Sequence, residues 1–395
     1  MDTFRSVAER FGIADAQVEP VGTGGDLAAA TGADGAVLIR KWPADTAAAQ
    51  PNLVATVLAR VAEPIANLLP RPVPVAETID TWSVTEDGGI YTAMTLLEGR
   101  PLARYGGFKT PDGVTIDVPL PTSAPADQVI LDVARVLGTV HQVAQDLTGQ
   151  ALGGRVSTLR VLEDSRTVWN RQRPVIGQSA GQVQEIRRWL RCGNRVFPVA
   201  EEYLGAPREE AVTIIHGDLW PTNVLVTGAS PNFELSGLTG WSTLRAGSPL
   251  VDLAALVTHT SGWSGARAES VLGAYTETAA LSPVERRLLP VIAALDLVPR
   301  VGTMLQLAYL DDRMIGDEAE PVLRSALKSL LHSLENLTSI LAPEARWDQR
   351  KANEVRRERS DDATRKTGPK RTTTARQSGA TRSRQGSPRG TRKAG

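Results

Sequence analysis

The sequence contains very few residues of the types that build disulfides and zinc clusters. Cys192 is the only cysteine among 395 residues, so an intrachain disulfide and a cysteine-based zinc cluster are both excluded. The histidines show no metal-ligand spacing; they are His141, His216, His259 and His332. The sequence therefore predicts neither a disulfide framework nor a structural zinc site.

Long apolar runs are also absent. No segment approaches the roughly 18 uninterrupted apolar residues of a membrane helix. Residues 1–5 lack the basic and then apolar pattern that begins a signal peptide. Hydrophobic residues make up 42% of the chain, which is ordinary for a soluble protein. We expect a cytoplasmic protein with no membrane partner.

The last part of the chain lacks acidic and large apolar residues. Residues 363–395 contain no Asp or Glu, and residues 345–395 carry 16 Lys and Arg against 5 Asp and Glu. Residues 1–344 have the opposite balance, with 28 basic and 39 acidic residues. A segment like 345–395 cannot bury enough apolar surface to offset its ordering entropy, so we expect a disordered basic tail. Its partner would be nucleic acid or another polyanion, unless the tail only solubilises the acidic body.

The body reads as a small mixed lobe followed by a larger helical lobe, as its length suggests. After a short helix at 2–11, alternating residues predict a five-stranded sheet, with strands at 18–21, 36–42, 73–80, 82–85 and 90–96. One helix, at 53–62, is inserted and ends before Pro64, and 104–127 reads as a loop-rich insertion. Helical spacing follows at 127–145, 251–260, 283–309 and 321–341.

One loop carries side chains suited to phosphoryl transfer. The segment His216–Leu225 places Asp218 and, five residues later, Asn223 on a tight turn that leads into a strand. In phosphoryl transfer an Asp accepts the proton of the attacking hydroxyl and an Asn oxygen ligates Mg²⁺, so both must converge from one short loop. The next strand carries Gly240 where a second metal-binding Asp is expected.

The segment His216–Leu225 resembles the His-Gly-Asp-x-x-x-x-Asn loop of the aminoglycoside phosphotransferase and choline kinase family. Other segments resemble that family in the same order, namely the glycine-rich turn 22–25, the strand 37–40, the hinge-like 94–99, the helix 136–141 and the block 247–254. Each segment alone is weak, but the ordered set, spanning residues 15–340, is specific.

This resemblance implies an α+β, bilobal, protein-kinase-like fold. A small N-lobe with an antiparallel sheet and one helix would span 1–93, and a hinge would span 94–99. A large, mainly helical C-lobe would span 100–343, followed by the basic tail at 345–395.

The resemblance also implies roles for residues of the loop. Asp218 would be the catalytic base for the hydroxyl of a small-molecule acceptor. Asn223 would hold Mg²⁺. His216 and Asp252 would support the loop structurally.

ATP is the nucleotide that the resemblance implies, and three segments would bind it. Arg40 would meet the α and β phosphates, since a guanidinium can bind phosphate with a planar fork. The backbone amides of Gly24 and Gly25 would cover the phosphates. Adenine would bond to the main chain near Thr95 and Leu97.

The sequence departs from the family at both electrostatic supports of the transferred phosphate. Gly240 offers no ligand, and no acid occurs from 235 to 251, so we expect weak Mg²⁺ binding. No acid occurs from 46 to 62 either, where the helix should pair with Arg40, and Arg40 has no obvious partner.

Three functional hypotheses follow. The first is a degenerate, pseudokinase-like member that binds a nucleotide or a small hydroxyl compound with little transfer. The second is an active ATP-dependent kinase of a sugar, amino sugar or aminoglycoside hydroxyl that uses Asp218 as base. The third is a polyanion-binding protein that acts through the tail at 345–395.

Overall fold

The computed structural model describes residues 2–21, 26–33, 35–47, 49–69, 78–83, 89–103, 105–109, 115–119, 127–151, 155–205, 209–229, 232–310 and 319–343. The chain divides into two units, residues 1–344 and 345–395. The glycine-rich turn at 22–25 and the basic tail lie outside the described residues, so their expected roles stay predictions.

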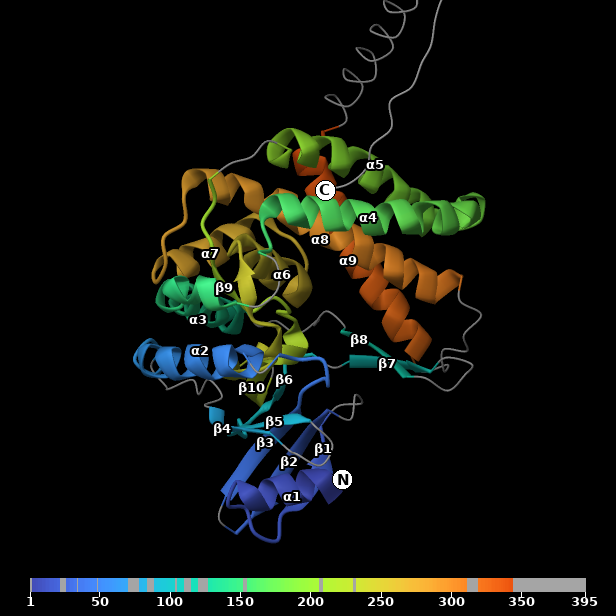
Figure 1. Ribbon diagram of the computed structural model, residues 1–395. Helices are drawn as coiled ribbons and strands as arrows, with labels where there is room; N and C mark the ends of the chain where they lie inside the picture. Colours follow the sequence, from blue (N-terminus) through green and yellow to red (C-terminus); the bar gives the residue numbers. More distant parts are fainter. Residues whose placement is uncertain are drawn as a thin grey trace, which may run out of the picture. The chain divides into compact units, whose positions relative to one another are not determined.

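The N-terminal part is a five-stranded antiparallel sheet in the order β1-β2-β3-β5-β4 (Figure 1). Its strands are β1 (Gln17–Pro20), β2 (Leu27–Gly32), β3 (Gly35–Lys41), β4 (Thr78–Ser83) and β5 (Ile90–Thr95). Helix α1 (Asp2–Arg10) contacts β2 and β3, and the rings of Phe4 and Tyr91 meet edge to face at 5.8 Å. Alternate strand residues such as Ile39 complete this small apolar core.

Three sequence predictions for this part were wrong in detail. Strand β2 was not predicted, because its sequence is rich in Ala and Gly, which have low strand propensity. The expected strands 73–80 and 82–85 are replaced, among the described residues, by the single strand β4. Helix α2 (Ala49–Ala66) does not stop before Pro64 but includes it near its end.

The rest of residues 1–344 is mainly helical. Its helices are α3 (Asp127–Val143), α4 (Thr158–Ile176), α5 (Gln184–Leu204), α6 (Leu250–Ser261), α7 (Gly265–Thr276), α8 (Pro283–Tyr309) and α9 (Ala319–Leu341). Helix α8 contacts α4, α5, α6 and α9 (Figure 1). Among the described residues it is the one helix long and apolar enough to cross a membrane, but 72% of its most apolar window is buried inside the protein. It is the central helix of the larger core, and the α+β fold class is confirmed.

Short strands accompany these helices. Strand β9 (Thr213–Ile215) pairs with β12 (Arg245–Gly247), and β10 (Val224–Ala229) pairs with β11 (Asn232–Leu238) and with β6 (Arg100–Pro101). The region 104–127, expected to be loop-rich, contains the hairpin of β7 (Tyr105–Lys109) and β8 (Thr115–Pro119). Strands β9 and β12 matter most here, because the loop that carries Asp218 follows β9.

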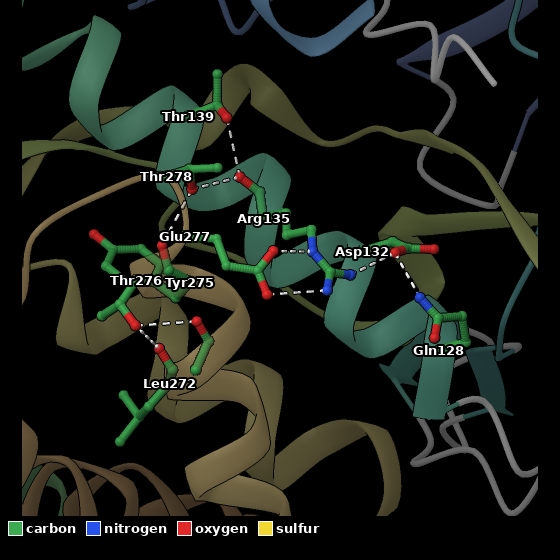
Figure 2. A network of polar contacts seen from close by, with 10 residues as sticks. Gln128, Asp132, Arg135, Thr139, Leu272, Tyr275, Thr276, Glu277 and Thr278 are labelled. Atoms are coloured by element: carbon green, nitrogen blue, oxygen red, sulfur yellow. Dashed lines mark hydrogen bonds and ion pairs between the residues drawn. The ribbon is translucent and has the colours of Figure 1, made fainter. Parts of the chain in front are cut away.

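Helices α3 and α7 are locked together at a close approach (Figure 2). Arg135 on α3 donates from Nε and Nη2 to the carboxylate of Glu277, at 2.7 and 3.2 Å, just after α7. The hydroxyl of Thr278 donates to the main-chain oxygen of Arg135 at 3.0 Å. A Cβ at Gly138 would clash with the Thr278 hydroxyl and lie 2.8 Å from the main-chain oxygen of Tyr275. Glycine therefore permits this approach, which fixes the following turn of α3.

The single thiol is buried in the helical core. Cys192 lies on α5 and is 3% exposed. Burial raises the pKa of this thiol, against a smaller lowering effect of its hydrogen bond with Thr338. The side chain is structural, as is usual for buried cysteines.

Candidate active site

The chain turns sharply where β9 ends, at the loop His216–Asn223. Gly217 has a φ of 79°, which few residues other than glycine adopt. A Cβ here would lie 2.8 Å from Nε of Arg245 and 2.9 Å from the main-chain oxygen of Thr243. Both the backbone conformation and the lack of space therefore require glycine directly before Asp218.

A buried carboxylate holds the start of this loop. Asp252, in the first turn of α6, is 1% exposed and accepts from the main-chain N–H of His216 at 2.7 Å and of Gly217 at 2.9 Å. His141 on α3 contacts the same carboxylate through Nε2 at 3.1 Å, and its Nδ1 lies 3.0 Å from the hydroxyl of Tyr275. Burial alone would raise the pKa of Asp252, but the hydrogen bonds and charges of His141 and its neighbours outweigh burial and lower it.

His216 is fully buried and makes a hydrogen bond on each ring nitrogen, one within the loop and one to the segment after β11. Nε2 lies 2.8 Å from the main-chain oxygen of Thr239, and Nδ1 lies 3.3 Å from the main-chain nitrogen of Asp218. A ring protonated on Nε2 donates to Thr239 and accepts from Asp218. Its contacts are those of a side chain that braces the loop.

Asp218 and Asn223 are brought together, as their spacing predicts. The Asn223 Nδ2 donates to the main-chain oxygen of Asp218 at 2.8 Å, which closes the loop. Asp218 is half-buried, and no described side chain or main-chain group bonds to its carboxylate. Oδ1 of Asn223 is likewise without a partner among the described residues, so the Asp218 carboxylate and the Asn223 side-chain oxygen are available to a ligand.

Gly240 directly faces Asn223. Its φ is 84°, and a Cβ at this position would lie 2.7 Å from both Cγ and Nδ2 of Asn223. Mg²⁺ is normally held by one or two carboxylates together with phosphate oxygens, and the carboxylate expected at position 240 is absent. No group of three or more His, Cys, Asp or Glu side chains suited to a metal occurs among the described residues. The residues present do not fit the Mg²⁺ arrangement that the resemblance implies.

Arg40 has a partner, contrary to the sequence prediction. Its Nη2 lies 3.2 Å from Oδ2 of Asp26, and the guanidinium lies 5.7 Å from the ring centre of Trp42. Asp26 directly precedes β2, in which Leu27 pairs with Arg40 across the sheet. The carboxylate therefore comes from the residue before the neighbouring strand instead of from the inserted helix.

Helix α2 contacts the loop that follows Gly240. Gln50, in its first turn, donates from Nε2 to the main-chain oxygen of Leu244 at 2.8 Å and lies 3.4 Å from that of Ser242. Residues 46–62 contain no acid, and the neutral amide of Gln50 makes a main-chain contact from this helix. This residue was missed because glutamine at a helix start carries no distinctive signal.

The expected hinge is ordered around a small apolar cluster. Thr95 ends β5, and Leu97 is buried against Met94 and Leu225. The hydroxyl of Ser236 donates to the main-chain oxygen of Glu98 at 2.8 Å. These contacts join the end of the sheet to β10 and β11.

A model of the phosphotransferase enzyme family matches residues 28–291, which include most of β2, the inserted helix and the whole loop around Asp218. The chain belongs to this family. The predicted resemblance to aminoglycoside phosphotransferases is thereby confirmed. A comparison with curated proteins finds no match.

Solved structures share the fold of this phosphotransferase-family chain at low identity. A microcompartment-associated aminopropanol kinase has a TM-score of 0.57 and 15% identity, covering 86% of this chain and 98% of its own. A Ralstonia eutropha protein assigned as an aminoglycoside phosphotransferase has a TM-score of 0.50 and 14% identity, with the same coverage. Spectinomycin phosphotransferase, solved with ADP and spectinomycin, has a TM-score of 0.50 and 9% identity, covering 85% and 98%.

Sequence reasoning missed a cluster around Trp220, which the phosphotransferase loop carries two residues after Asp218. The Trp220 ring stacks on the His259 ring, with 3.9 Å between ring centres. The guanidinium of Arg300, on α8, lies 4.4 Å from the centre of the Trp220 ring. Asp296 bonds to both, at 2.7 Å from His259 and 2.9 Å from Arg300. Burial alone would raise the pKa of Asp296, but the charges of Arg300 and His259 outweigh burial and lower it. No local pattern links these residues, because they come from three separate segments.

Proposed function

We propose that this phosphotransferase-family chain binds a nucleotide or a small hydroxyl compound at the loop around Asp218, with little or no phosphoryl transfer. The observation that carries the proposal is Gly240, which supplies no ligand and faces the Asn223 amide. In phosphoryl transfer, a divalent metal neutralises the charge that develops on the phosphate oxygens. A chain that lacks the carboxylate for that metal loses its largest electrostatic support for transfer.

Binding is supported by the cation on the third strand. The Arg40 side chain is 18% exposed and is oriented by Asp26, which is 45% exposed. A guanidinium fixed in this way offers several N–H donors to phosphate oxygens at small entropic cost. The nucleotide is proposed to be ATP, in line with the ADP that spectinomycin phosphotransferase binds.

A working ATP-dependent kinase is the second candidate, and the intact loop favours it. The loop around Asp218 is held by Asp252, His216 and Gly217, and the carboxylate of Asp218 has no partner among the described residues. Asp218 would take the proton of an acceptor hydroxyl. The oxygen of that hydroxyl would form a bond to the γ-phosphorus of ATP as the bond to the leaving ADP breaks. The acceptor would be a sugar, an amino sugar or an aminoglycoside.

Calorimetric titration of the full-length chain with ATP, with and without Mg²⁺, separates the two candidates. We expect ATP to bind with an affinity that Mg²⁺ does not change, both in the wild type and in Asn223→Ala. Binding that strengthens with Mg²⁺ and loses this dependence in Asn223→Ala would instead show that the metal site survives. Absence of ATP binding would remove the nucleotide from the proposal.

Gly240→Asp, with Gly240→Ala as its matched control, tests the missing ligand directly. Asp visits the left-handed region more readily than most residues, and the Asn223 amide is the end of a side chain that can shift. We expect Gly240→Asp to make ATP binding depend on Mg²⁺, while Gly240→Ala adds the same Cβ without this effect. If both variants behave like the wild type, position 240 is not the cause of weak metal binding.

A further inference from the structure

A cavity of about 300 Å³ lies at the far end of β9 and β12 from the loop that carries Asp218. Its wall includes residues at the starts of three helices, namely Thr158 of α4, Leu250 of α6 and Glu285 of α8. Ser248, which follows β12, also lines it. A volume of this size is at the lower end of the range for small-molecule sites.

Two oxygens of side chains in this wall are buried without a hydrogen-bond partner. They are Oγ of Ser248, a residue 1% exposed, and Oε1 of Glu285, a residue 9% exposed. The other carboxylate oxygen of Glu285 accepts from the main-chain nitrogen of Ser282 at 2.8 Å in a capping box. A buried acceptor without a donor is unfavourable, and a ligand that brings N–H groups would remove that cost.

The charge of the lining is of one sign. Glu209, Glu210 and Glu285 line the cavity, and the described lining residues include no Lys, Arg or His. The Glu210 carboxylate accepts from the main-chain nitrogen of Thr158 at 3.1 and 3.3 Å, which leaves further lone pairs free. Arg155 bonds to the main-chain oxygen of Glu210 and does not line the cavity. Such a lining attracts a cation.

An organic cation fits this lining better than a metal ion. The described residues contain no group of three or more His, Cys, Asp or Glu side chains placed to hold a metal. Leu250, Val284 and Leu288 give the cavity an apolar portion that would contact an aliphatic chain. An ammonium group supplies three donors and no acceptor, which matches the unpartnered oxygens.

We propose that this cavity binds a small organic ammonium ion. Its N–H groups would donate to Ser248 Oγ and Glu285 Oε1, and its aliphatic chain would lie against Leu288. The site is separate from the loop that carries Asp218 and does not rest on the proposed function. A bound amine would sit directly before the turn of α6 that carries Asp252.

Titration of the full-length chain with n-butylammonium, n-butanol and butyrate tests the chemistry of the site. The three probes share an aliphatic chain and differ in charge and donors. We expect saturable binding of n-butylammonium alone. Absence of saturable n-butylammonium binding, or n-butanol binding of equal strength, would overturn the proposal.

Two variants test the location. Ser248→Ala removes a hydroxyl that makes no hydrogen bond, and Glu285→Gln keeps a side chain that can complete the capping box, so we expect both to fold. Each should weaken n-butylammonium binding about tenfold, as expected for one lost hydrogen bond to a charged group. Glu320→Gln, in an exposed ion pair on α9, and Asp218→Asn should leave it unchanged.

The comparison of these variants decides the proposal. Unaltered binding in Ser248→Ala and Glu285→Gln, with unchanged thermal unfolding midpoints, would place the amine elsewhere and refute the site. If Glu285→Gln fails to fold, Ser248→Ala alone decides. Loss of amine binding in Asp218→Asn would show that the amine binds at the loop that carries Asp218, and this result would also overturn the proposal.

Discussion

Asp252 shows how one buried carboxylate shapes the loop that precedes it. It accepts from two consecutive main-chain N–H groups and from His141, so three donors depend on one side chain. Because Asp252 is only 1% exposed, a lost acceptor leaves a buried donor unsatisfied. The geometry of Asp218 is therefore set by a residue that lies far from it in the sequence.

Replacing Asp252 with Asn should cost about 1–3 kcal/mol of unfolding free energy, because its amide turns one acceptor into a donor facing an N–H group. The folded pKa of Asp252 lies below its ordinary value of 3.8. The carboxylate therefore stabilises the fold above pH 3.8 and loses this contribution as the pH falls through the folded pKa. Denaturant unfolding between pH 2 and pH 7, roughly the range of carboxyl titration, should show a shallower acid dependence in Asp252→Asn. Asp164→Asn, in an exposed pair, is the control and should match the wild type.

Arg40 is expected to bind the nucleotide phosphates, and its neighbour offers a control. Arg40→Gln should weaken ATP binding about tenfold or more, since hydrogen bonds from a charged donor are lost. Lys41 follows it on β3 and points to the other face of the sheet, toward the Tyr91 ring. Lys41→Gln removes the same charge and should change ATP affinity little. Calorimetry of both variants measures this difference, and equal losses would contradict a direct role for Arg40.

At the level of elements, the approach of α3 to α7 places His141 where it reaches Asp252. Gly138 permits that approach one turn earlier, and Arg135 secures it from the exposed side. The loop at Asp218 thus depends on the packing of two helices that carry none of its residues.

Gly138→Ala tests this packing against helix propensity. Propensity alone favours Ala by roughly 1 kcal/mol, whereas the clash with Thr278 and the Tyr275 main chain should cost about 1–3 kcal/mol. Gly273 on α7 faces open space, since a Cβ there would meet no described atom within 4 Å, so Gly273→Ala should be neutral or stabilising. Denaturant unfolding of both variants gives the comparison. A stable Gly138→Ala variant would show that the helices can separate without cost.

An element could be predicted where contiguous residues determine it, and it could not where contacts with distant segments determine it. The loop at Asp218 and the helices α3, α6, α8 and α9 could be predicted, because their residues and periodicities are contiguous. Helices α4, α5 and α7 were missed. Strand β2 could not, because its alanines are held in the sheet by their neighbours and not by propensity. The Asp26 partner of Arg40 depends on the register of that strand, so missing the strand meant missing the ion pair.

For the molecule as a whole, the strongest sequence feature is the division of charge at about residue 345. Deleting 345–395 removes 16 Lys and Arg and leaves a body with an excess of acids. We expect the full chain to bind a fluorescent polyanion such as heparin or single-stranded DNA, with affinity that falls steeply as salt rises. The deletion should abolish this binding and leave ATP binding unchanged. Fluorescence anisotropy over a salt series tests it, and polyanion binding by the truncated body would contradict the role of the tail.

Cys192 makes the molecule well suited to labelling. The thiolate is the reactive form, and burial raises the pKa of this thiol, so a maleimide at neutral pH should spare it. Cysteines introduced at Glu9 on α1 and at Lys328 on α9, both exposed, would then be the labelled positions without removal of the native residue. Energy transfer between two dyes at these positions would report directly whether ATP draws the sheet and the helical part together.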